Sequence, residues 1–391
     1  MKVVQINATA NRGGTGRVCS GISELLTEEG IENYIFYVSG NSFPNGINYA
    51  SELELKLEAL KSRIFGNYGF NSRLITKRQI KKIDEIKPDV VHLHNLHGHN
   101  VNLKMLFNYF KKNPQIKLFW TFHDCWSFTG YCPYFEMSKC DKWKTECNNC
   151  PQSKRYSWFF DKSKRLFNEK RELFSSLNLT IVTPSKWLQG LVKQSFLKDY
   201  EVKVINNGID IDKFKPTESD FREKYNLENK KIVLGVADGW AKRKGIDIFI
   251  ELSKILPEDY QIVLVGMKSN SNIELPDNII SIGRTEDTGE LAKIYTAADA
   301  FVNPTSDDTY PTVNMEAVAC GTPVVTSRIG GSPETIDEKT GIVVDINDID
   351  GFKNAIIYAC ESSHFSQEDF YEKAILFDKK EKFKEYIELY N

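Results

Sequence analysis

The segment spanning residues 298–326 constrains the fold most, because it predicts a strand, a polar loop, a helix and a second strand in direct succession. Residues 298–303 are apolar enough for a buried strand, and residues 304–309 are typical turn material. Pro311 suits the first helical position and Gly321 the residue after the helix end. The next strand starts at Pro323, so the segment predicts a β-α-β unit of an α/β protein.

The loop before this helix is predicted to bind an anion. The backbone N–H groups of Thr312 and Val313 lie at the positive end of the helix, which favours phosphate binding. Asp308 on the loop and Glu316 in the helix stand eight residues apart and bracket this site. Because carboxylates repel phosphates, these two side chains are expected to bind hydroxyl groups.

The pattern resembles the acid-x7-acid motif, followed by A-x-G-x-P-V-V, of the retaining GT-B glycosyltransferases of family 4 (group 1). The resemblance implies that Asp308 contacts the hydroxyls of the donor sugar and that Glu316 holds the nucleotide ribose. Asp308 stands where the family usually has Glu, which is longer by one methylene. Further donor contacts are expected from Tyr310, Pro311, Thr312 and Val313.

Length and charge suggest two domains with different roles. A chain of 391 residues, 41% of them hydrophobic, is long enough for two α/β domains of ordinary size. Residues 1–205 carry 30 Lys and Arg against 19 Asp and Glu, whereas the remainder carries 21 against 34. The basic first half suits an anionic acceptor or a membrane surface, or it is simply a solvated basic face. No nucleic-acid partner is expected.

The sequence contains no apolar stretch of about 18 residues or more, and residues 1–6 lead into a strand without a signal-peptide pattern. The protein is therefore expected to be cytoplasmic, or peripheral on the inner face of the cell membrane.

Near the N-terminus, residues 3–6 predict a strand that is followed by a glycine-rich turn and a helix. Gly13, Gly14 and Gly16 let a ligand approach the backbone closely, although a plain tight turn would use the same residues. In the resembled family this loop closes over the donor phosphates. The spacing does not fit G-x-G-x-x-G, which disfavours an NAD-dependent dehydrogenase.

His123 follows a strand predicted at 118–122, and side chains at the carboxyl end of such a strand point into the ligand crevice. It matches the family histidine at the reaction centre near the donor sugar. Asp124 is expected either to orient His123 or to cap the next turn. The histidines at 92, 94, 97 and 99 resemble the family's D-x-V-H-x-H segment, where no metal is expected, and His97 or His99 is expected near the acceptor.

Five of the eight cysteines lie between residues 125 and 150, which in a reducing compartment favours metal binding over disulfides. The spacing C-x7-C-x6-C-x2-C supplies thiolates from Cys132, Cys140, Cys147 and Cys150, and C-x2-C is typical of tetrahedral Zn²⁺ sites. A structural zinc is expected, with free thiols or an iron–sulfur cluster as alternatives. The insert resembles one in a family subset linked to capsule and exopolysaccharide synthesis.

The stretch 156–174 is aromatic and basic and predicts an amphipathic helix. Its apolar side is formed by Phe159, Phe160, Leu166, Phe167, Leu173 and Phe174. The preferred interpretation is that this side packs on the first domain. The alternative is that it lies on an anionic bilayer, where a lipid-linked acceptor would be found.

In the second half, Lys244 matches the family's pyrophosphate-binding lysine and follows a strand predicted at 231–236. Gly239 stands where the family usually has Arg, so Arg243 or Lys242 is expected to supply the second positive charge. Arg284, after a further strand, is expected to contact the donor. No D-x-D-like acid pair is evident near the donor site, so these cations and the helix end must neutralise the leaving diphosphate, which predicts catalysis without a metal cofactor.

These patterns together predict a GT-B protein with two facing Rossmann-like, doubly wound α/β domains and a cleft between them. Residues 1–205 would bind the acceptor and include the cysteine insert at 125–150, residues 206–375 would bind the donor, and residues 376–391 would cross back to the first domain. The last strand of the first domain is expected at 181–185, with residues 202–207 in the interdomain connection.

The resemblance implies a retaining hexosyltransferase. Its donor would be a UDP- or GDP-linked sugar, and its acceptor a sugar hydroxyl of a glycan, expected to be a lipid-linked intermediate of a bacterial surface polysaccharide. His123, Asp308 and Glu316 are the expected catalytic residues. The alternatives are an NDP-sugar epimerase or hydrolase of the same fold and a non-enzymatic, zinc-containing glycan-binding protein.

Overall fold

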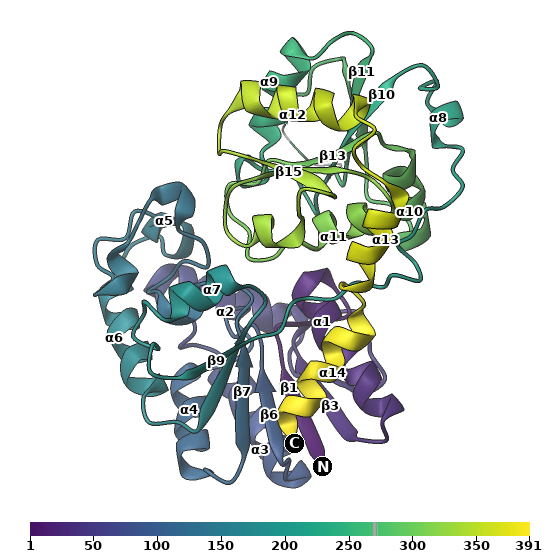
Figure 1. Cartoon of the computed structure of the whole chain (residues 1–391). Helices are drawn as coiled ribbons and strands as arrows, with labels where there is room; N and C mark the ends of the chain where they lie inside the picture. Colours follow the sequence, from purple (N-terminus) through teal and green to yellow (C-terminus); the bar gives the residue numbers. More distant parts are fainter. Residues whose placement is uncertain (269–270, 272) are drawn as a thin grey trace. The chain divides into compact units, whose positions relative to one another are not determined.

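The computed structural model of the chain describes residues 1–268, 271 and 273–391 (Figure 1). The chain divides into two compact units, one formed by Met1–Asn206 with Lys382–Asn391 and the other by Asn207–Glu381. Each unit is built on a parallel sheet, so the predicted α/β fold class with two Rossmann-like domains is confirmed. In the described part of the chain, no helix combines the length and the apolar character that crossing a bilayer requires.

The first unit contains a seven-stranded sheet in the order β5-β3-β1-β6-β7-β8-β9. Its strands are β1 (Lys2–Ile6), β3 (Glu32–Tyr37), β5 (Gly46–Asn48), β6 (Val90–Leu93), β7 (Lys117–Thr121), β8 (Leu179–Thr183) and β9 (Glu201–Val204). The short β2 (Thr9–Ala10) pairs separately with β4 (Ser39–Gly40). The chain runs from β1 outward to β5 and returns on the other side of β1 as β6, so the strand order reverses between β1 and β6.

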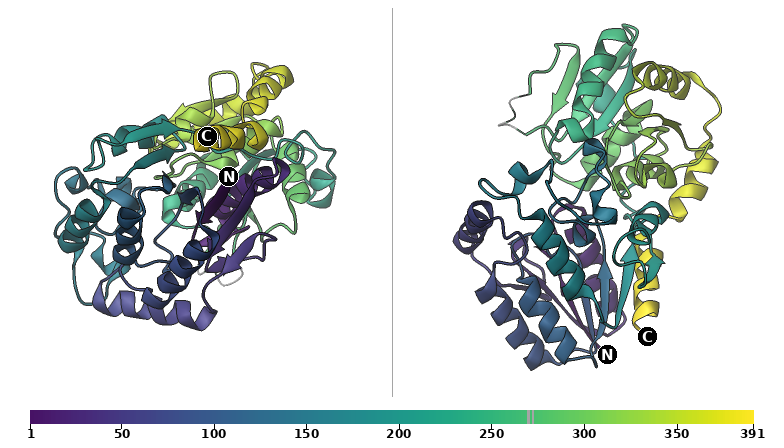
Figure 2. Two further views of the ribbon diagram at one scale, coloured as in Figure 1. Left: turned by 90° about the horizontal axis from the view of Figure 1, so that it is seen from below. Right: turned by 90° about the vertical axis from the view of Figure 1, so that its left-hand side faces the viewer.

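Alternate residues of these strands pack on opposite faces of the sheet. Val4 packs in a cluster with Phe107 and Phe167, whereas Val3 packs in another cluster with Ile22 and Phe383. The helices of this unit are α1 (Gly13–Glu28), α2 (Glu52–Phe65), α3 (Arg73–Ile86), α4 (Leu103–Lys112), α5 (Ser153–Tyr156), α6 (Ser163–Phe174), α7 (Lys186–Val192) and α14 (Lys379–Tyr390), and helices pack on both faces of the sheet (Figure 2). The 3₁₀ turns are η1 (Trp126–Phe128), η2 (Glu136–Ser138) and η3 (Lys142–Lys144).

α14 packs closely on α1, and a glycine makes this approach possible. A Cβ atom added to Gly21 would lie 2.2 Å from the ring of Phe383, which is too close for two carbon atoms. Tyr390, at the end of α14, is fully buried and its hydroxyl lies 2.6 Å from Nδ1 of His92 on β6. α14 therefore completes the core of the first unit.

The second unit contains a six-stranded sheet in the order β12-β11-β10-β13-β14-β15. Its strands are β10 (Lys231–Val236), β11 (Tyr260–Val265), β12 (Ile279–Ile282), β13 (Ala300–Asn303), β14 (Val324–Ser327) and β15 (Gly341–Val344). Its helices are α8 (Phe221–Lys224), α9 (Ile246–Ile255), α10 (Thr288–Ala297), α11 (Thr312–Ala319), α12 (Ile349–Glu361) and α13 (Gln367–Ile375), with 3₁₀ turns η4 (Lys242–Lys244) and η5 (Ser332–Thr335). The strand order reverses between β10 and β13.

The prediction that the first sheet ends at 181–185 was wrong. β8 is followed by β9, which pairs with it in parallel from Glu201 to Val204. β9 lies at the edge of the sheet, where Val202 is buried but Glu201 and Lys203 are exposed. A four-residue strand in which only half of the side chains face the protein has too weak an apolar pattern to be distinguished from an interdomain connection by sequence.

α6 packs its apolar side on the first unit, as the preferred interpretation of the sequence expected. Leu166, Phe167, Leu173 and Phe174 are buried in this helix. Phe159 and Phe160, which lie directly before this helix, are exposed and do not pack on the unit.

Candidate active site

In the second unit, the predicted donor residues meet at the carboxyl ends of β10 and β13, the neighbouring strands where the strand order reverses. Nζ of Lys244 lies 2.7 Å from Oδ2 of Asp308, and the two side chains are only 23% and 17% exposed. Ligands bind at such reversal points in open α/β sheets. The fold thus joins two predicted residues that stand 64 positions apart in the sequence.

The turn that carries Lys244 is attached to the loop that carries Asp308. The guanidinium of Arg243 donates to the backbone oxygen of Asp307 at 2.8 Å, and the carbonyl of Arg243 accepts from the backbone N–H of Ser306 at 2.9 Å. Arg243 therefore supports the loop directly, whereas Lys242 is exposed.

Two glycines allow the backbone around this pair to come close together. Gly245 closes the lysine turn with a φ of +76°, and a Cβ atom there would lie 2.4 Å from the oxygen of Pro304. Gly330 has a φ of +58°, and its Cβ atom would lie 1.8 Å from the oxygen of Asp308. Larger residues at either position would displace the Asp308 loop.

α11 begins at Thr312, one residue later than predicted. Pro311 has an extended backbone (φ −71°, ψ 117°) and therefore precedes the helix. Among the described residues, no side chain caps this helix end. The N–H groups of Thr312 and Val313 belong to its first turn, where anions are favoured.

Glu316 lies buried within α11 and accepts a hydrogen bond from the hydroxyl of Tyr295 at 3.1 Å. Burial, together with the Glu316 carboxylate, raises the pKa of Tyr295 well above its ordinary value, so the hydroxyl keeps its proton and can donate. Sequence analysis missed Tyr295, because only the fold places α10 beside α11.

Asn314 is a second residue that sequence analysis missed. Its side chain is fully buried and binds Asn303 at 2.8 Å, Thr335 at 2.9 Å and Thr326 at 3.3 Å. These bonds tie α11 to β13, β14 and η5. The signal in the sequence was a polar residue within an apolar helix, since buried amides need such partners.

The other predicted donor residues differ in position. Tyr310 is buried in the hydrophobic core of the second unit, and burial followed by the charge of Glu334 raises its pKa. Arg284 is exposed after the edge strand β12, and β11 separates this strand from β10. No contact that the structure describes brings Arg284 to the Lys244–Asp308 pair.

In the first unit, His123 follows β7 and belongs to a row of buried histidines. Its Nε2 lies 3.1 Å from Nδ1 of His94, and the two rings are stacked with centroids 5.4 Å apart. Burial lowers the pKa of His123 to about 4 and that of His92 to about 3, and it lowers the pKa of His94 well below its ordinary value. All three rings are therefore neutral near pH 7.

The hydrogen bonds assign the protons in this row. The amide of Gln5 donates to the carbonyl of Cys19 at 3.0 Å, so its oxygen accepts from Nε2–H of His94 at 3.0 Å. Nδ1 of the neutral His94 must then accept from Nε2–H of His123. In this tautomer Nδ1 of His123 is a hydrogen-bond acceptor.

Asp124 pairs with a different histidine from the one considered in the sequence analysis. Its Oδ2 lies 2.8 Å from Nε2 of His97, and its Oδ1 accepts from the backbone N–H of Trp126 at 2.9 Å. Burial raises the pKa of Asp124, but the pairing with His97 outweighs it and the pKa ends below its usual value. Asp124 thus caps the turn that follows and orients His97.

Lys170 of α6 also binds this turn. Its buried Nζ donates to the carbonyl of Trp126 at 2.7 Å and to that of Thr129 at 3.0 Å, and it lies 3.5 Å from the centre of the Trp126 ring. Burial lowers the pKa of Lys170 to about 7.

The prediction that the glycines near the N-terminus form a separate turn before the helix was wrong. Gly13, Gly14 and Gly16 form the first turn of α1 itself, which begins at Gly13. Gly13 has a φ of +67°, and a Cβ atom at Gly16 would lie 2.9 Å from Oγ1 of Thr9. The short β2 lies between β1 and this helix.

The four cysteines of the predicted zinc site line one small cavity of about 20 Å³. Burial raises the pKa of Cys147 to about 11 and also raises the pKa of Cys132 and Cys150. Across the described residues, no group of three or more His, Cys, Asp or Glu side chains has an arrangement that could hold a metal ion. Cys132, Cys140, Cys147 and Cys150 thus come together, whereas the zinc itself stays a prediction.

Two Rossmann-like units, the second with candidate ligand residues at its reversal point, define the architecture of the GT-B class. The chain belongs to the glycosyltransferases of family 4: the model described as "Glycosyltransferase Family 4" matches residues 12–213, and the model described as "Glycosyl transferases group 1" matches residues 217–377. The protein is therefore a glycosyltransferase.

Similar proteins include WcaC of Escherichia coli (strain K12), whose name assigns it to colanic acid biosynthesis as a glycosyl transferase. It is 25% identical over 381 residues, which cover 89% of this chain and 88% of WcaC. The D-inositol 3-phosphate glycosyltransferase of Mycobacterium sp. (strain JLS) is 28% identical over 169 residues, or 40% of this chain and 38% of that protein.

Solved structures share the fold over the whole chain. Sucrose-phosphate synthase of Thermosynechococcus elongatus has a TM-score of 0.74 at 17% identity and is matched over 98% of its length. Anabaena HepE in complex with UDP-glucose has a TM-score of 0.69 at 14% identity and is matched over 99% of its length.

Proposed function

We propose that this glycosyltransferase moves a hexosyl group from a UDP- or GDP-linked sugar to a hydroxyl of a lipid-linked polysaccharide intermediate, with retention at the anomeric carbon. The observation that carries the proposal is the Lys244–Asp308 pair at the reversal point of the second sheet, on the loop that leads into α11. A lysine ammonium and a helix N-terminus bind phosphates, and a carboxylate binds hydroxyls.

The ion pair suggests how the donor enters. In the structure, Asp308 is the partner of Lys244. A nucleoside diphosphate would supply phosphate oxygens to Lys244 and to the N–H groups of Thr312 and Val313, which would release Asp308 to accept from sugar hydroxyls. The same cation and helix end would then stabilise the diphosphate as its bond to the anomeric carbon breaks. We propose that this step needs no metal cofactor.

Glu316 and His123 complete the proposed assignments. Tyr295 holds the carboxylate of Glu316, which would accept from the ribose hydroxyls. The neutral His123 has Nδ1 as its acceptor, which suits a sugar hydroxyl and not an anionic oxygen. We expect Tyr310 and Pro311 to shape the donor loop, while Arg284 has no described contact with the pair.

The named relatives support the choice of substrates. WcaC acts, by its name, in the synthesis of a surface polysaccharide, and HepE has been seen with UDP-glucose. Solved structures with the same fold also include WaaG, which is described as a glycosyltransferase involved in lipopolysaccharide biosynthesis. A lipid-linked acceptor would place this protein on the cytoplasmic side of a membrane, in peripheral contact through its basic first half.

The test is thermal stabilisation of the purified protein by UDP, GDP, ADP and CMP in the presence of EDTA. A ligand that binds only the folded state raises the melting temperature. One nucleoside diphosphate should stabilise the native protein, whereas Lys244→Ala and Glu316→Ala should lose the effect. Lys254→Ala is the matched control, because Lys254 forms an exposed ion pair with Glu251 in the same unit. A native protein that responds to none of the nucleotides would refute the proposal.

Product analysis then separates transfer from the related reactions. An NDP-sugar hydrolase or epimerase would release free sugar or an epimer when no acceptor is present. The transferase should consume its donor only when an acceptor glycan is added, and NMR of the product should show the anomeric configuration of the donor.

A further inference from the structure

The aromatic residues Trp158, Phe159 and Phe160 form an exposed loop between α5 and α6, here named the aromatic loop. Their side chains are 48%, 65% and 52% exposed. The three rings contact one another, with centroids 6.4 Å and 6.3 Å apart for the two successive pairs. Three adjacent aromatic side chains in solvent are costly in a protein that has no use for them.

The aromatic loop is held in this exposed position by the fold. The backbone N–H of Trp158 donates to the carbonyl of Arg63 at 2.8 Å, near the end of α2. Oγ of Ser157 accepts from the backbone N–H of Phe160 at 3.2 Å, and Asp161 accepts from the backbone N–H of Ser163 at 2.9 Å. The rings are therefore presented to solvent by an ordered backbone.

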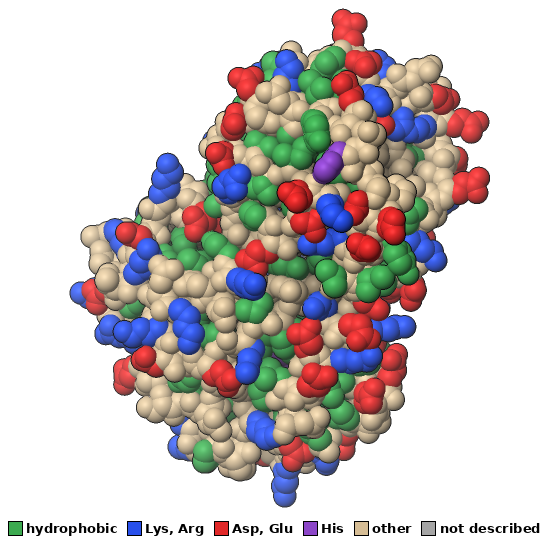
Figure 3. Space-filling view, in the orientation of Figure 1, with side chains coloured by type: hydrophobic (Ala, Val, Ile, Leu, Met, Phe, Trp, Pro, Cys, Tyr) green, Lys and Arg blue, Asp and Glu red, His purple; other side chains and the backbone are tan. Residues whose placement is uncertain are grey.

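Positive charge surrounds the aromatic loop. Residues 151–165 contain five Lys and Arg side chains and one Asp, a net charge of +4. Lys162 lies 5.4 Å from the centre of the Phe160 ring. On the face of the molecule that Figure 3 shows, Lys and Arg side chains are scattered among Asp, Glu and hydrophobic ones.

α2, to which the loop is attached, also exposes apolar side chains. Leu53, Leu57 and Leu60 are 67%, 48% and 43% exposed. Their spacing places them on one side of the helix, opposite its buried residue Ser62. The helix thus directs these three leucines away from the protein, whereas Leu55 packs against the core.

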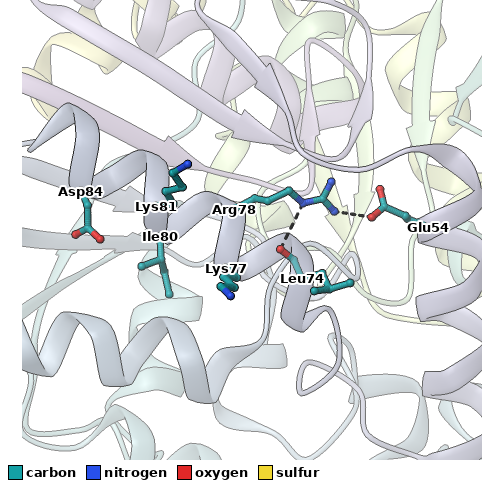
Figure 4. A pocket seen from close by; sticks show the side chains of 7 residues that line it. All are labelled: Glu54, Leu74, Lys77, Arg78, Ile80, Lys81 and Asp84. Carbon is teal, nitrogen blue, oxygen red and sulfur yellow. Dashed lines mark hydrogen bonds and ion pairs between the residues drawn. The ribbon is translucent and has the colours of Figure 1, made fainter.

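The other end of α2 is linked to α3, where a surface pocket combines apolar and basic side chains (Figure 4). Arg78 pairs with Glu54 of α2, and both line the pocket. The other lining residues are Leu74, which is 72% exposed, Ile80, the basic Lys77 and Lys81, and the acidic Asp84. α2 is about 20 Å long. Exposed apolar residues with nearby cations therefore extend from α3 along α2 to the aromatic loop.

We propose that the aromatic loop and the leucine side of α2 insert into the surface of an anionic lipid bilayer. Aromatic rings and leucines enter the boundary between headgroups and acyl chains, and the surrounding Lys and Arg bind anionic headgroups. A protein partner would need a matching acidic surface with a defined shape, whereas a bilayer accepts an extended mixture of apolar and basic side chains. This contact would be the part of the protein that makes the membrane association in the proposed function. The bilayer contact itself does not depend on the transfer reaction.

The test is co-sedimentation of the full chain with vesicles of phosphatidylcholine alone and of phosphatidylcholine with about a third phosphatidylglycerol. The native protein should bind the anionic vesicles and release them as salt is raised. The triple variant Trp158→Ser, Phe159→Ser, Phe160→Ser should bind at least about tenfold more weakly. The double variant Tyr371→Ser, Leu376→Ser removes comparably exposed apolar side chains from the second unit and should bind like the native protein.

The thermal response to nucleoside diphosphates keeps this proposal separate from the proposed function, because the triple variant should retain it. The proposal is overturned if the native protein does not bind the anionic vesicles, or if the triple variant binds them as well as the native protein does. Self-association that the triple variant abolishes, without vesicle binding, would identify a second copy of this chain as the occupant and would overturn it as well.

Discussion

The row of neutral histidines predicts that the first unit loses stability steeply in mild acid. The folded-state pKa values of His92 and His123 are about 3 and 4, and that of His94 is also well below its ordinary value. An unfolded histidine has a pKa of about 6.5. The unfolded chain therefore binds more protons below this pH, and stability falls as the pH decreases from about 6.5 toward 4.

The size of the effect follows from the same values. Between about pH 7 and pH 5, protonation of one unfolded histidine lowers the free energy of unfolding by roughly 1.9 kcal/mol when its folded counterpart stays neutral. Three such residues give a loss of about 5 to 6 kcal/mol. This loss is comparable to the whole stability of many domains, which is roughly 5 to 15 kcal/mol.

The assay is urea unfolding at the two pH values, followed by tryptophan fluorescence. Five of the six tryptophans belong to the first unit, so the signal reports mainly on it. His94→Gln should reduce the pH difference by about a third, whatever it does to stability at pH 7. His364→Gln is the control, because His364 is exposed in the second unit. A His94→Gln variant with the native pH dependence would refute the assignment of a neutral His94.

Three substitutions test other contacts. Lys170→Met should lower the free energy of unfolding by about 2 to 5 kcal/mol, measured with urea, because two buried carbonyls lose their donor. Gly330→Ala should abolish stabilisation by nucleoside diphosphate, because its Cβ atom would displace Asp308, whereas Gly190→Ala, which meets no atom within 4 Å, should keep it. Phe383→Ala should cost about 3 to 5 kcal/mol of stability by leaving a cavity in the core.

Much of the fold and part of the site could be predicted from the sequence. Apolar runs bounded by turns located most of the central strands, and the spacing of Asp308 and Glu316 located the donor loop. The edge strand β9 was missed, because half of its side chains face solvent. The start of α11 was misplaced by one residue, because both positions suit a proline.

Contacts between distant segments could not be predicted. Tyr295 reaches Glu316 across 21 positions, and Gln5 reaches His94 across 89. Cysteine spacing predicted that four thiols come together, but whether they surround a metal depends on the geometry of a loop with little regular structure, which spacing alone does not specify. Nor could the pattern of stretch 156–174 show that α6 is buried while the aromatic loop before it is exposed.

The chain forms the second unit between the two segments of the first unit, and this order affects how the protein folds during its synthesis. Residues 207–381 form a contiguous unit, which can fold as soon as it has left the ribosome. The first unit, although its strands are made earlier, must wait for residues 382–391, because the ring of Phe383 fills the space over Gly21 and Tyr390 binds His92. Until then this face of the first sheet is covered by α1 but not by α14, so the part that is translated first is the last to be completed.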